Sequence, residues 1–259
     1  MDVVILCGGK GTRISEETAF KPKPMVKIGG MPILWHIMKL YSYYGCKRFI
    51  LALGYKHEII MQYFHNLRNT NGDFLPKINS KVDLDHFYKD NDWEIIFANT
   101  GQDTLKGGRI KRIEKHLISK SFHLTYGDGV SNININDLWT FHQSHNCLGT
   151  VTAVRPPSRF GELKLDDDSV LDIQEKPQMG QGYINGGYFV FNREMLNYLS
   201  TSKSCDFEFG PLQKISRDGG LKAFKHEGFW QCMDNVRERD YLDKLIANCL
   251  LYTSDAADD

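Results

Sequence analysis

The chain has 259 residues, of which 41% are hydrophobic and 25% charged, and its 32 basic and 32 acidic side chains leave no net charge. This length supports one large or two unequal units with a substantial core. A neutral chain without a basic run argues against nucleic acid as the main partner, because that affinity comes mostly from clustered lysine and arginine.

No segment approaches the ~20 apolar residues that span a bilayer, and the first apolar run has no basic leader. We therefore expect no membrane association and a cytoplasmic location. The six cysteines lack the paired spacing of zinc sites or disulfide frameworks, and the nine histidines are scattered. These features predict reduced cysteines in the core.

The first element is a nearly continuous apolar run over residues 2–7 that stops at a glycine cluster. Such a run is typical of a buried parallel strand whose carboxyl end leads into a ligand loop. Because glycine has no Cβ, the backbone N–H groups of this cluster can converge on a phosphate, and Arg13, Lys21 and Lys23 could neutralise its charge. A plain tight turn is the alternative for a lone glycine cluster, and neither standard phosphate-binding glycine fingerprint is matched.

Strand and helix patterns then alternate along the chain. Strands are predicted at 47–53, 93–99, 121–126 and 149–154, and helices at 32–41, 59–67, 110–117 and 134–145. This rhythm predicts an α/β fold with a doubly wound, mostly parallel sheet. Residues 69–92 are rich in Asn, Asp and Lys and are interpreted as a long excursion from the core.

The pattern changes after residue 154, where short strands dominate. They are predicted at 161–165, 170–173 (joined by a hairpin-like turn), 183–191 and 221–225, with a helix at 207–216. We expect 155–246 to form a smaller, mixed β-rich portion with a closing helix, continuous with the core at 1–154. The tail at 247–259 matches no motif and is interpreted as carrying no chemistry.

Asp128 is a candidate metal ligand, and Asp234 is a second carboxylate. Asp128 lies between Gly127 and Gly129 directly after a predicted strand, where ligands bind in open α/β sheets. A turn aspartate is the alternative for an isolated Gly-Asp-Gly. Asp234 follows a second strand-like segment that contains Trp230.

The segment Leu6-Cys7-Gly8-Gly9-Lys10-Gly11-Thr12-Arg13, together with Lys21-Pro22-Lys23-Pro24, resembles the signature of the sugar-phosphate nucleotidylyltransferases. The spelling of Ser15–Thr18 and Lys27–Met38 is similar to that of the glucose-1-phosphate cytidylyltransferases within that family. Apart from 69–92 and the tail, the resemblance covers nearly the whole chain. It implies a Rossmann-like fold of the nucleotidyltransferase type and synthesis of CDP-glucose and pyrophosphate from CTP and glucose 1-phosphate.

The resemblance also implies a nucleotide-binding set: Leu6, Cys7, Gly8, Gly9, Gly11, Thr12, Arg13, Lys23, Thr104, Arg109 and Gly127. Within it, Arg13 would act on the leaving pyrophosphate and Lys23 on the transferred group. Thr104 and Arg109 would read cytosine, because an arginine can donate to its acceptors. From the residues alone, an ordinary loop with helix-start chemistry at Asp103 or Thr104 is the favoured interpretation of segment 100–109.

For the sugar phosphate the resemblance implies Glu175, Lys176, Asn185, Gly186 and Trp230. Glu175 would bind sugar hydroxyls and Lys176 the phosphate. A surface ion pair and a strand bulge are the plainer interpretations of these two motifs.

Mg²⁺ on Asp128 and Asp234 and a homo-oligomeric assembly are likewise implied by resemblance. A transferase that uses UTP or dTTP, and a catalytically silent regulatory subunit that binds nucleotide sugars, are the alternatives.

Overall fold

The computed structural model describes residues 1–11, 14–69, 93–156, 162–166, 169–174 and 182–247 of the chain. Its centre is a seven-stranded sheet in the order β12-β8-β11-β6-β1-β4-β5. The strands are β1 (Asp2–Cys7), β4 (Arg48–Leu53), β5 (Glu94–Asn99), β6 (Ser121–Tyr126), β8 (Gly149–Val154), β11 (Ile184–Asn192) and β12 (Leu221–His226).

Most neighbouring strands of this sheet run parallel. β1 is parallel to β4 and β6, β4 to β5, and β12 to β8, whereas β11 is antiparallel to both of its neighbours. The predicted mostly parallel α/β sheet is therefore confirmed. β11 comes from the second half of the chain and lies between β8 and β6, so both halves share one sheet. The boundary at residue 154 stays a prediction.

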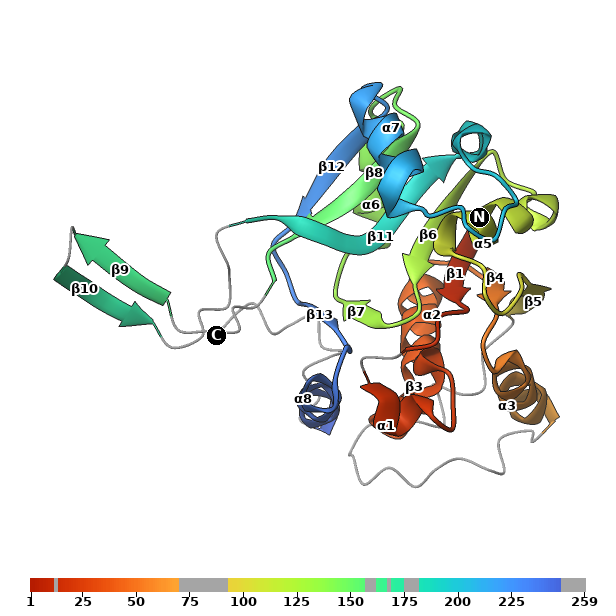
Figure 1. Ribbon diagram of the computed structural model, residues 1–259, viewed down its shortest axis with the longest axis horizontal. Helices are drawn as coiled ribbons and strands as arrows, with labels where there is room; N and C mark the ends of the chain where they lie inside the picture. Colours follow the sequence, from red (N-terminus) through yellow and green to blue (C-terminus); the bar gives the residue numbers. More distant parts are fainter. Residues whose placement is uncertain (12–13, 70–92, 157–161, 167–168, 175–181, 248–259) are drawn as a thin grey trace.

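Helices cover both faces of the sheet (Figure 1). One face carries α2 (Ile33–Tyr43), α3 (His57–Asn69), α6 (Ile135–Gln143) and α8 (Val236–Ala247). The other carries α5 (Lys106–Arg112), the 3₁₀ helix η4 (Arg193–Tyr198) and α7 (Gln213–Arg217). Alternate residues of β1 face the two cores, Val3 and Ile5 on one side and Val4 and Leu6 on the other. This double burial explains why the strand reads as a continuous apolar run.

Three small antiparallel pairs complete the strands of the described residues. β9 (Glu162–Asp166) and β10 (Ser169–Gln174) form the expected hairpin, which projects away from the main sheet (Figure 1). β2 (Lys27–Ile28) pairs with β3 (Met31–Pro32). β7 (Gly129–Ser131) pairs with β13 (Trp230–Cys232), and the backbone N–H of Met233 donates to the Asp128 carbonyl at 2.9 Å. This last pair brings together two segments about a hundred residues apart in sequence.

Two helix predictions are wrong in extent. The helix expected at 110–117 begins at Lys106 and ends at Arg112, and a 3₁₀ turn (η3, Glu114–His116) follows it. The helix expected at 207–216 is broken, because η5 (Glu208–Leu212) contains an extended Phe209 and a Gly210 with φ of 106°. Pro211 follows directly and has no N–H to continue the helical ladder. Regular helix resumes only at α7.

Other predictions concern segments that lie largely outside the described residues. These are the excursion at 69–92 and the tail at 247–259. Within the described residues, no helix is both long and apolar enough to cross a membrane.

Candidate active site

The glycine-rich loop starts where β1 ends, and its first glycine is needed for close packing. A Cβ on Gly8 would lie 2.1 Å from Nη1 of Arg109, and a Cβ on Gly54, after β4, would lie 2.3 Å from the same nitrogen. Gly9 has open space around it, and Gly11 adopts a left-handed φ of 64°. The loop is therefore tightly packed where it starts, at Gly8, and turns at Gly11 through a backbone conformation that favours glycine.

Arg109 holds the carboxyl ends of three strands together. The residue is 4% exposed, and its guanidinium donates five hydrogen bonds of 2.7–3.1 Å, to Thr100 Oγ1 and to the carbonyls of Gly8, Leu53, Gly101 and Gln102. Burial and the neighbouring Arg112 lower its pKa, which starts so high that the group stays charged. In this arrangement Arg109 binds backbone carbonyls, and its role in reading a base stays a prediction.

Thr104 is also engaged within the protein, since its hydroxyl accepts a hydrogen bond from Arg112 Nη1 at 2.8 Å. The glycine pair that follows it serves helix packing. A Cβ on Gly107 would lie 2.3 Å from the Asp206 carbonyl oxygen, and one on Gly108 would lie 2.4 Å from that of Ser202. These glycines let segment 202–206 pack against α5.

Lys23 is held by the two prolines beside it. It starts the 3₁₀ helix η2 (Lys23–Met25), with Pro22 as the capping residue and Pro24 in the first turn. The N–H of Met25 donates to the Pro22 carbonyl at 2.8 Å, and that of Val26 to the Lys23 carbonyl at 3.0 Å. This short rigid turn buries Lys23 and fixes the direction in which its side chain leaves the backbone.

The ammonium of Lys23 lies between the two candidate metal ligands. Its Nζ is 2.6 Å from Asp128 Oδ2 and 2.6 Å from Asp234 Oδ1. Burial opposes the charge on Lys23, but the two carboxylates outweigh it, so the pKa of Lys23 is raised. The structure thus brings Lys23 and both aspartates together in one cluster. In this cluster the Lys23 ammonium contacts the two carboxylates, whereas the resemblance implies that it acts on the transferred group.

This cluster has the chemistry of a site for a hard divalent cation. Asp128 and Asp234 both direct a carboxylate oxygen at the Lys23 ammonium, and their side chains are 30% and 14% exposed. Mg²⁺ is typically bound through one or two carboxylates, with water and substrate phosphates as its other ligands. The residues present therefore fit such an ion.

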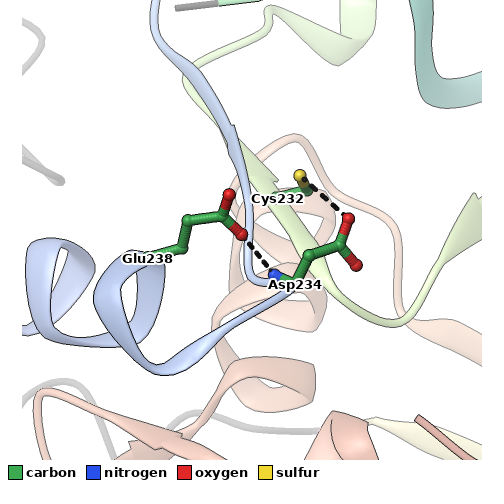
Figure 2. Close-up of side chains that lie close together, drawn as sticks. All are labelled: Cys232, Asp234 and Glu238. Atoms are coloured by element: carbon green, nitrogen blue, oxygen red, sulfur yellow. Dashed lines mark hydrogen bonds between the residues drawn. The ribbon is translucent and has the colours of Figure 1, made fainter. Parts of the chain in front are cut away.

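Asp234 is itself oriented by its neighbours, which Figure 2 shows. Its backbone N–H donates to Glu238 Oε2 at 2.5 Å, and the N–H of Glu238 donates to Asn235 Oδ1 at 2.9 Å. This is a reciprocal cap at the start of α8. The sequence analysis missed Glu238, for which the signal was the Asn-x-x-Glu spacing from Asn235.

Cys232, Asp234 and Glu238 bring possible ligand atoms within 4.8 Å of one another. Burial and the adjacent carboxylates raise the pKa of Cys232 to about 12, so its thiol is protonated near neutral pH. The S–H group donates to Asp234 Oδ2 at 3.8 Å, and the Glu238 carboxylate accepts from the backbone. The trio therefore orients Asp234, because the Cys232 S–H and the Glu238 carboxylate both bond to it.

Of the residues expected on the sugar side, Asn185 and Gly186 lie at the start of β11 and Trp230 lies in β13. Trp230 Nε1 donates to the Gly186 carbonyl at 2.7 Å, which connects β13 to β11. Asn185 is exposed, and its Nδ2 donates to the Tyr126 hydroxyl at 3.3 Å. Tyr126 in turn donates to Glu208 Oε1 at 2.6 Å.

Tyr126 and Glu208 were missed in the sequence. Tyr126 looked like the last apolar residue of a strand, and Glu208 belongs to the broken helix. Burial and the Glu208 carboxylate raise the pKa of Tyr126, so it stays a hydrogen-bond donor.

Gly127 brings two loops together: a Cβ there would lie 2.9 Å from both the Leu6 carbonyl oxygen and Pro24 Cγ. Leu6 and Cys7 are buried at the end of β1, so the structure gathers most of the expected nucleotide set at one edge of the sheet. Four expected residues lie outside the described part of the chain: Thr12, Arg13, Glu175 and Lys176.

Comparison with known proteins gives the family. Residues 2–231 match the family model described as nucleotidyl transferase. The chain is 42% identical over 246 residues to the glucose-1-phosphate cytidylyltransferase of Salmonella typhi, covering 95% of each protein. It is also 42% identical over 237 residues to a probable glucose-1-phosphate cytidylyltransferase of Bacillus subtilis, covering 92% of each.

Among solved structures, the chain is similar to HddC from Yersinia pseudotuberculosis complexed with GMP-PN. The TM-score is 0.67 at 25% identity, and the match covers 95% of this chain and 99% of that one. The match to the family model and the identity to these relatives show that the chain belongs to the nucleotidyl transferase family.

Proposed function

We propose that the protein transfers a cytidylyl group from CTP to α-D-glucose 1-phosphate, which gives CDP-glucose and pyrophosphate. One observation carries this most directly: Lys23, Asp128 and Asp234 form one charged cluster at the carboxyl edge of the sheet. The choice of CTP and glucose 1-phosphate is supported by the 42% identity to glucose-1-phosphate cytidylyltransferases.

The chemical problem in this reaction is charge. A sugar phosphate oxygen must attack the α-phosphorus of a nucleoside triphosphate, and both reactants are anionic. The sugar phosphate needs no general base, because its second pKa of about 6 leaves it largely a dianion near neutral pH. Catalysis then depends on positioning and on stabilising negative charge in the transition state.

The residues of the cluster suit these two tasks. Asp128 and Asp234 would hold the metal ion, which supplies charge neutralisation at the phosphates when bound. Lys23 would then contact the transferred phosphoryl group, because its ammonium lies next to the same carboxylate oxygens. Arg13, by resemblance, would stabilise the leaving pyrophosphate.

The substrates' other ends would lie on either side of this cluster. We place the nucleotide over the loop at Gly8, Gly9 and Gly11, with Thr104 and Arg109 nearest the base. The sugar would lie against Asn185, Gly186 and Trp230, with Glu175 and Lys176 on its hydroxyls and phosphate. We further expect a cytoplasmic homo-oligomer, and analytical ultracentrifugation of the purified protein would test the assembly.

A substrate panel tests this proposal. Pyrophosphate release is measured for CTP, UTP, dTTP and GTP, each with glucose 1-phosphate or mannose 1-phosphate, with Mg²⁺ and with a chelator. CTP with glucose 1-phosphate should be fastest by at least about tenfold, and chelation should abolish release. A faster rate with UTP or dTTP would reassign the base. Nucleotide-sugar binding without release for any pair would instead support a regulatory subunit.

A further inference from the structure

Four side chains from four separate segments meet beside the expected sugar side. Tyr126 ends β6, and its hydroxyl is 2.6 Å from Glu208 Oε1 in η5. The Lys106 ammonium, from the start of α5, forms an ion pair with the same oxygen and lies 4.9 Å from the centre of the Tyr126 ring. Asn185, at the start of β11, donates to the Tyr126 hydroxyl at 3.3 Å. Tyr126 is thus the common contact of the cluster.

The Tyr126 ring is fixed against the start of β11. A Cβ on Gly187 would lie 2.6 Å from Tyr126 Cδ2, and Gly187 has a φ of 79°, so both space and backbone conformation favour glycine there. The N–H of Gly187 also donates to Asn185 Oδ1 at 2.9 Å. The Asn185 amide is therefore bonded at both its nitrogen and its oxygen.

Charge sets the direction of this hydrogen-bond chain. The Glu208 carboxylate accepts, so the Tyr126 O–H donates its hydrogen bond to Glu208, and the Tyr126 oxygen can accept from the Asn185 amide. The Lys106 ammonium forms an ion pair with the same Glu208 carboxylate. Among the described residues, these bonds leave the exposed Asn185 amide one N–H and one carbonyl lone pair. That pair of groups matches a sugar hydroxyl, which both donates and accepts.

We propose that Tyr126 and Glu208 are positioning residues that hold the Asn185 amide toward a hydroxyl of the sugar 1-phosphate. This inference rests on the proposed function, because it takes Asn185 as a sugar contact. Glu208 acts through Tyr126, and Lys106 holds the Glu208 carboxylate beside the phenol. The same set joins α5 to β11, and hence the nucleotide side to the sugar side.

The test compares Tyr126→Phe, Glu208→Ala and Glu208→Gln with the wild type. The sugar phosphate is the one the wild-type enzyme uses fastest in the panel, so failure of the proposed function would already show in the wild type. KM for the sugar phosphate, KM for the nucleotide and kcat are measured separately, with melting temperatures. The Tyr126→Phe change removes only the hydroxyl and keeps the ring that packs against Gly187.

A matched control exists elsewhere in the chain. Tyr198 donates to Asp218 Oδ2 at 3.1 Å, and the Lys214 ammonium lies 5.5 Å from the Tyr198 ring centre. Tyr198→Phe and Asp218→Ala therefore remove the same kind of contact on a different surface. They should leave all kinetic constants within about twofold of wild type.

Tyr126→Phe and Glu208→Ala should each raise KM for the sugar phosphate about three- to tenfold, the range for one hydrogen bond, and leave KM for the nucleotide within about twofold. Glu208→Gln should recover most of the loss, because its carbonyl can still accept from Tyr126. The variant that combines Tyr126→Phe with Glu208→Ala should be no worse than the worse single variant. Equal increases in both KM values, or effects no larger than those of the control pair, would overturn the proposal.

Discussion

Lys23 shows how one side chain can be fixed by covalent stiffness and then by charge. The flanking prolines restrict the backbone, and the Asp128 and Asp234 carboxylates hold the ammonium at 2.6 Å each. Two carboxylates facing one point repel each other unless a cation lies between them. The lysine therefore stabilises the folded arrangement in the absence of a bound metal ion.

Replacing Lys23 with methionine tests that double role. Turnover should fall at least about a hundredfold, in line with the loss of a group that stabilises transition-state charge. The free energy of unfolding should fall by about 1–3 kcal/mol, after allowing for the partial exposure of the two aspartates.

Millimolar Mg²⁺ should recover part of that stability in the variant, because a bound cation favours the folded state and would replace the ammonium. Differential scanning calorimetry with and without Mg²⁺ measures this recovery of stability. A variant as stable as wild type, or one that Mg²⁺ does not stabilise, would contradict this account of the cluster. Lys10→Ala is the control, since Lys10 pairs with the exposed Asp103 at the surface.

At the residue scale, the sequence and the family resemblance identified Asp128, Asp234, Lys23 and the glycine loop as candidates, and the structure brings Lys23 and both aspartates together. It did not allow Tyr126, Glu208 and Glu238 to be predicted. Their roles arise from contacts between segments distant in sequence, such as the 82 positions that separate Tyr126 from Glu208. Arg109 illustrates the same limit, because its backbone acceptors lie on three different strand ends.

At the element scale, strands were easier to predict than helices. Runs such as 121–126 and 149–154 are apolar, bounded by glycine or polar residues and buried on both faces, so their limits agree with β6 and β8. α5 is harder because its buried face includes Gly107 and Gly108, which carry no hydrophobic signal and contact a distant backbone segment. The break in η5 follows from a left-handed Gly210 that only the folded chain reveals.

The connection between β2 and α2 gives a pH prediction. His36 in α2 is 5% exposed, and its Nε2 lies 2.8 Å from the Ile28 carbonyl oxygen, to which the neutral ring donates. Burial lowers the pKa of His36 to about 4, below the ordinary value of 6.5. The unfolded chain therefore binds the proton first, and stability is lost as the pH falls from about 6.5 toward 4.

The expected loss from His36 alone is about 2–3 kcal/mol across that interval. Chemical denaturation of wild type and His36→Gln at pH 7.5, 6, 5 and 4 measures it. The variant should start less stable and show a shallower decline. Parallel curves for the two proteins would show that His36 does not titrate in this way, and His57→Gln serves as a control on a partly exposed ring.

At the scale of the whole molecule, α8, the last helix of the described residues, links segments that surround the site. α8 follows Asp234 directly, and its Asp243 accepts from the Gly29 N–H at 2.6 Å. Arg239 of α8 pairs with Glu17, which also pairs with Lys21 at 2.7 Å. One helix thus connects the second aspartate to both the glycine-rich loop region and the turn after Lys23.

Gly29→Ala should disturb this closure. Its φ is 57°, and a Cβ there would lie 2.4 Å from Ile246 Cγ2 of α8. Gly45→Ala is the matched control, because Gly45 has a φ of 83° with open space around it. Both variants should lose about 1 kcal/mol of stability from the backbone conformation.

Only Gly29→Ala should also lower turnover, by about tenfold, because it displaces the helix that positions Asp234. Steady-state rates and thermal unfolding of the two variants separate the effects. If both variants lose the same fraction of activity, α8 does not position the site.

We propose that Asp128 and Asp234 act together on one divalent cation between the two substrates. The most direct measurement is the Mg²⁺ dependence of turnover for wild type, Asp128→Asn and Asp234→Asn, with circular dichroism to check the fold. Each asparagine keeps the size of the side chain and removes its charge. We expect folded variants whose rates at saturating Mg²⁺ are lower by a factor of about a hundred or more. A wild-type rate with an unchanged Mg²⁺ requirement in either variant would contradict it.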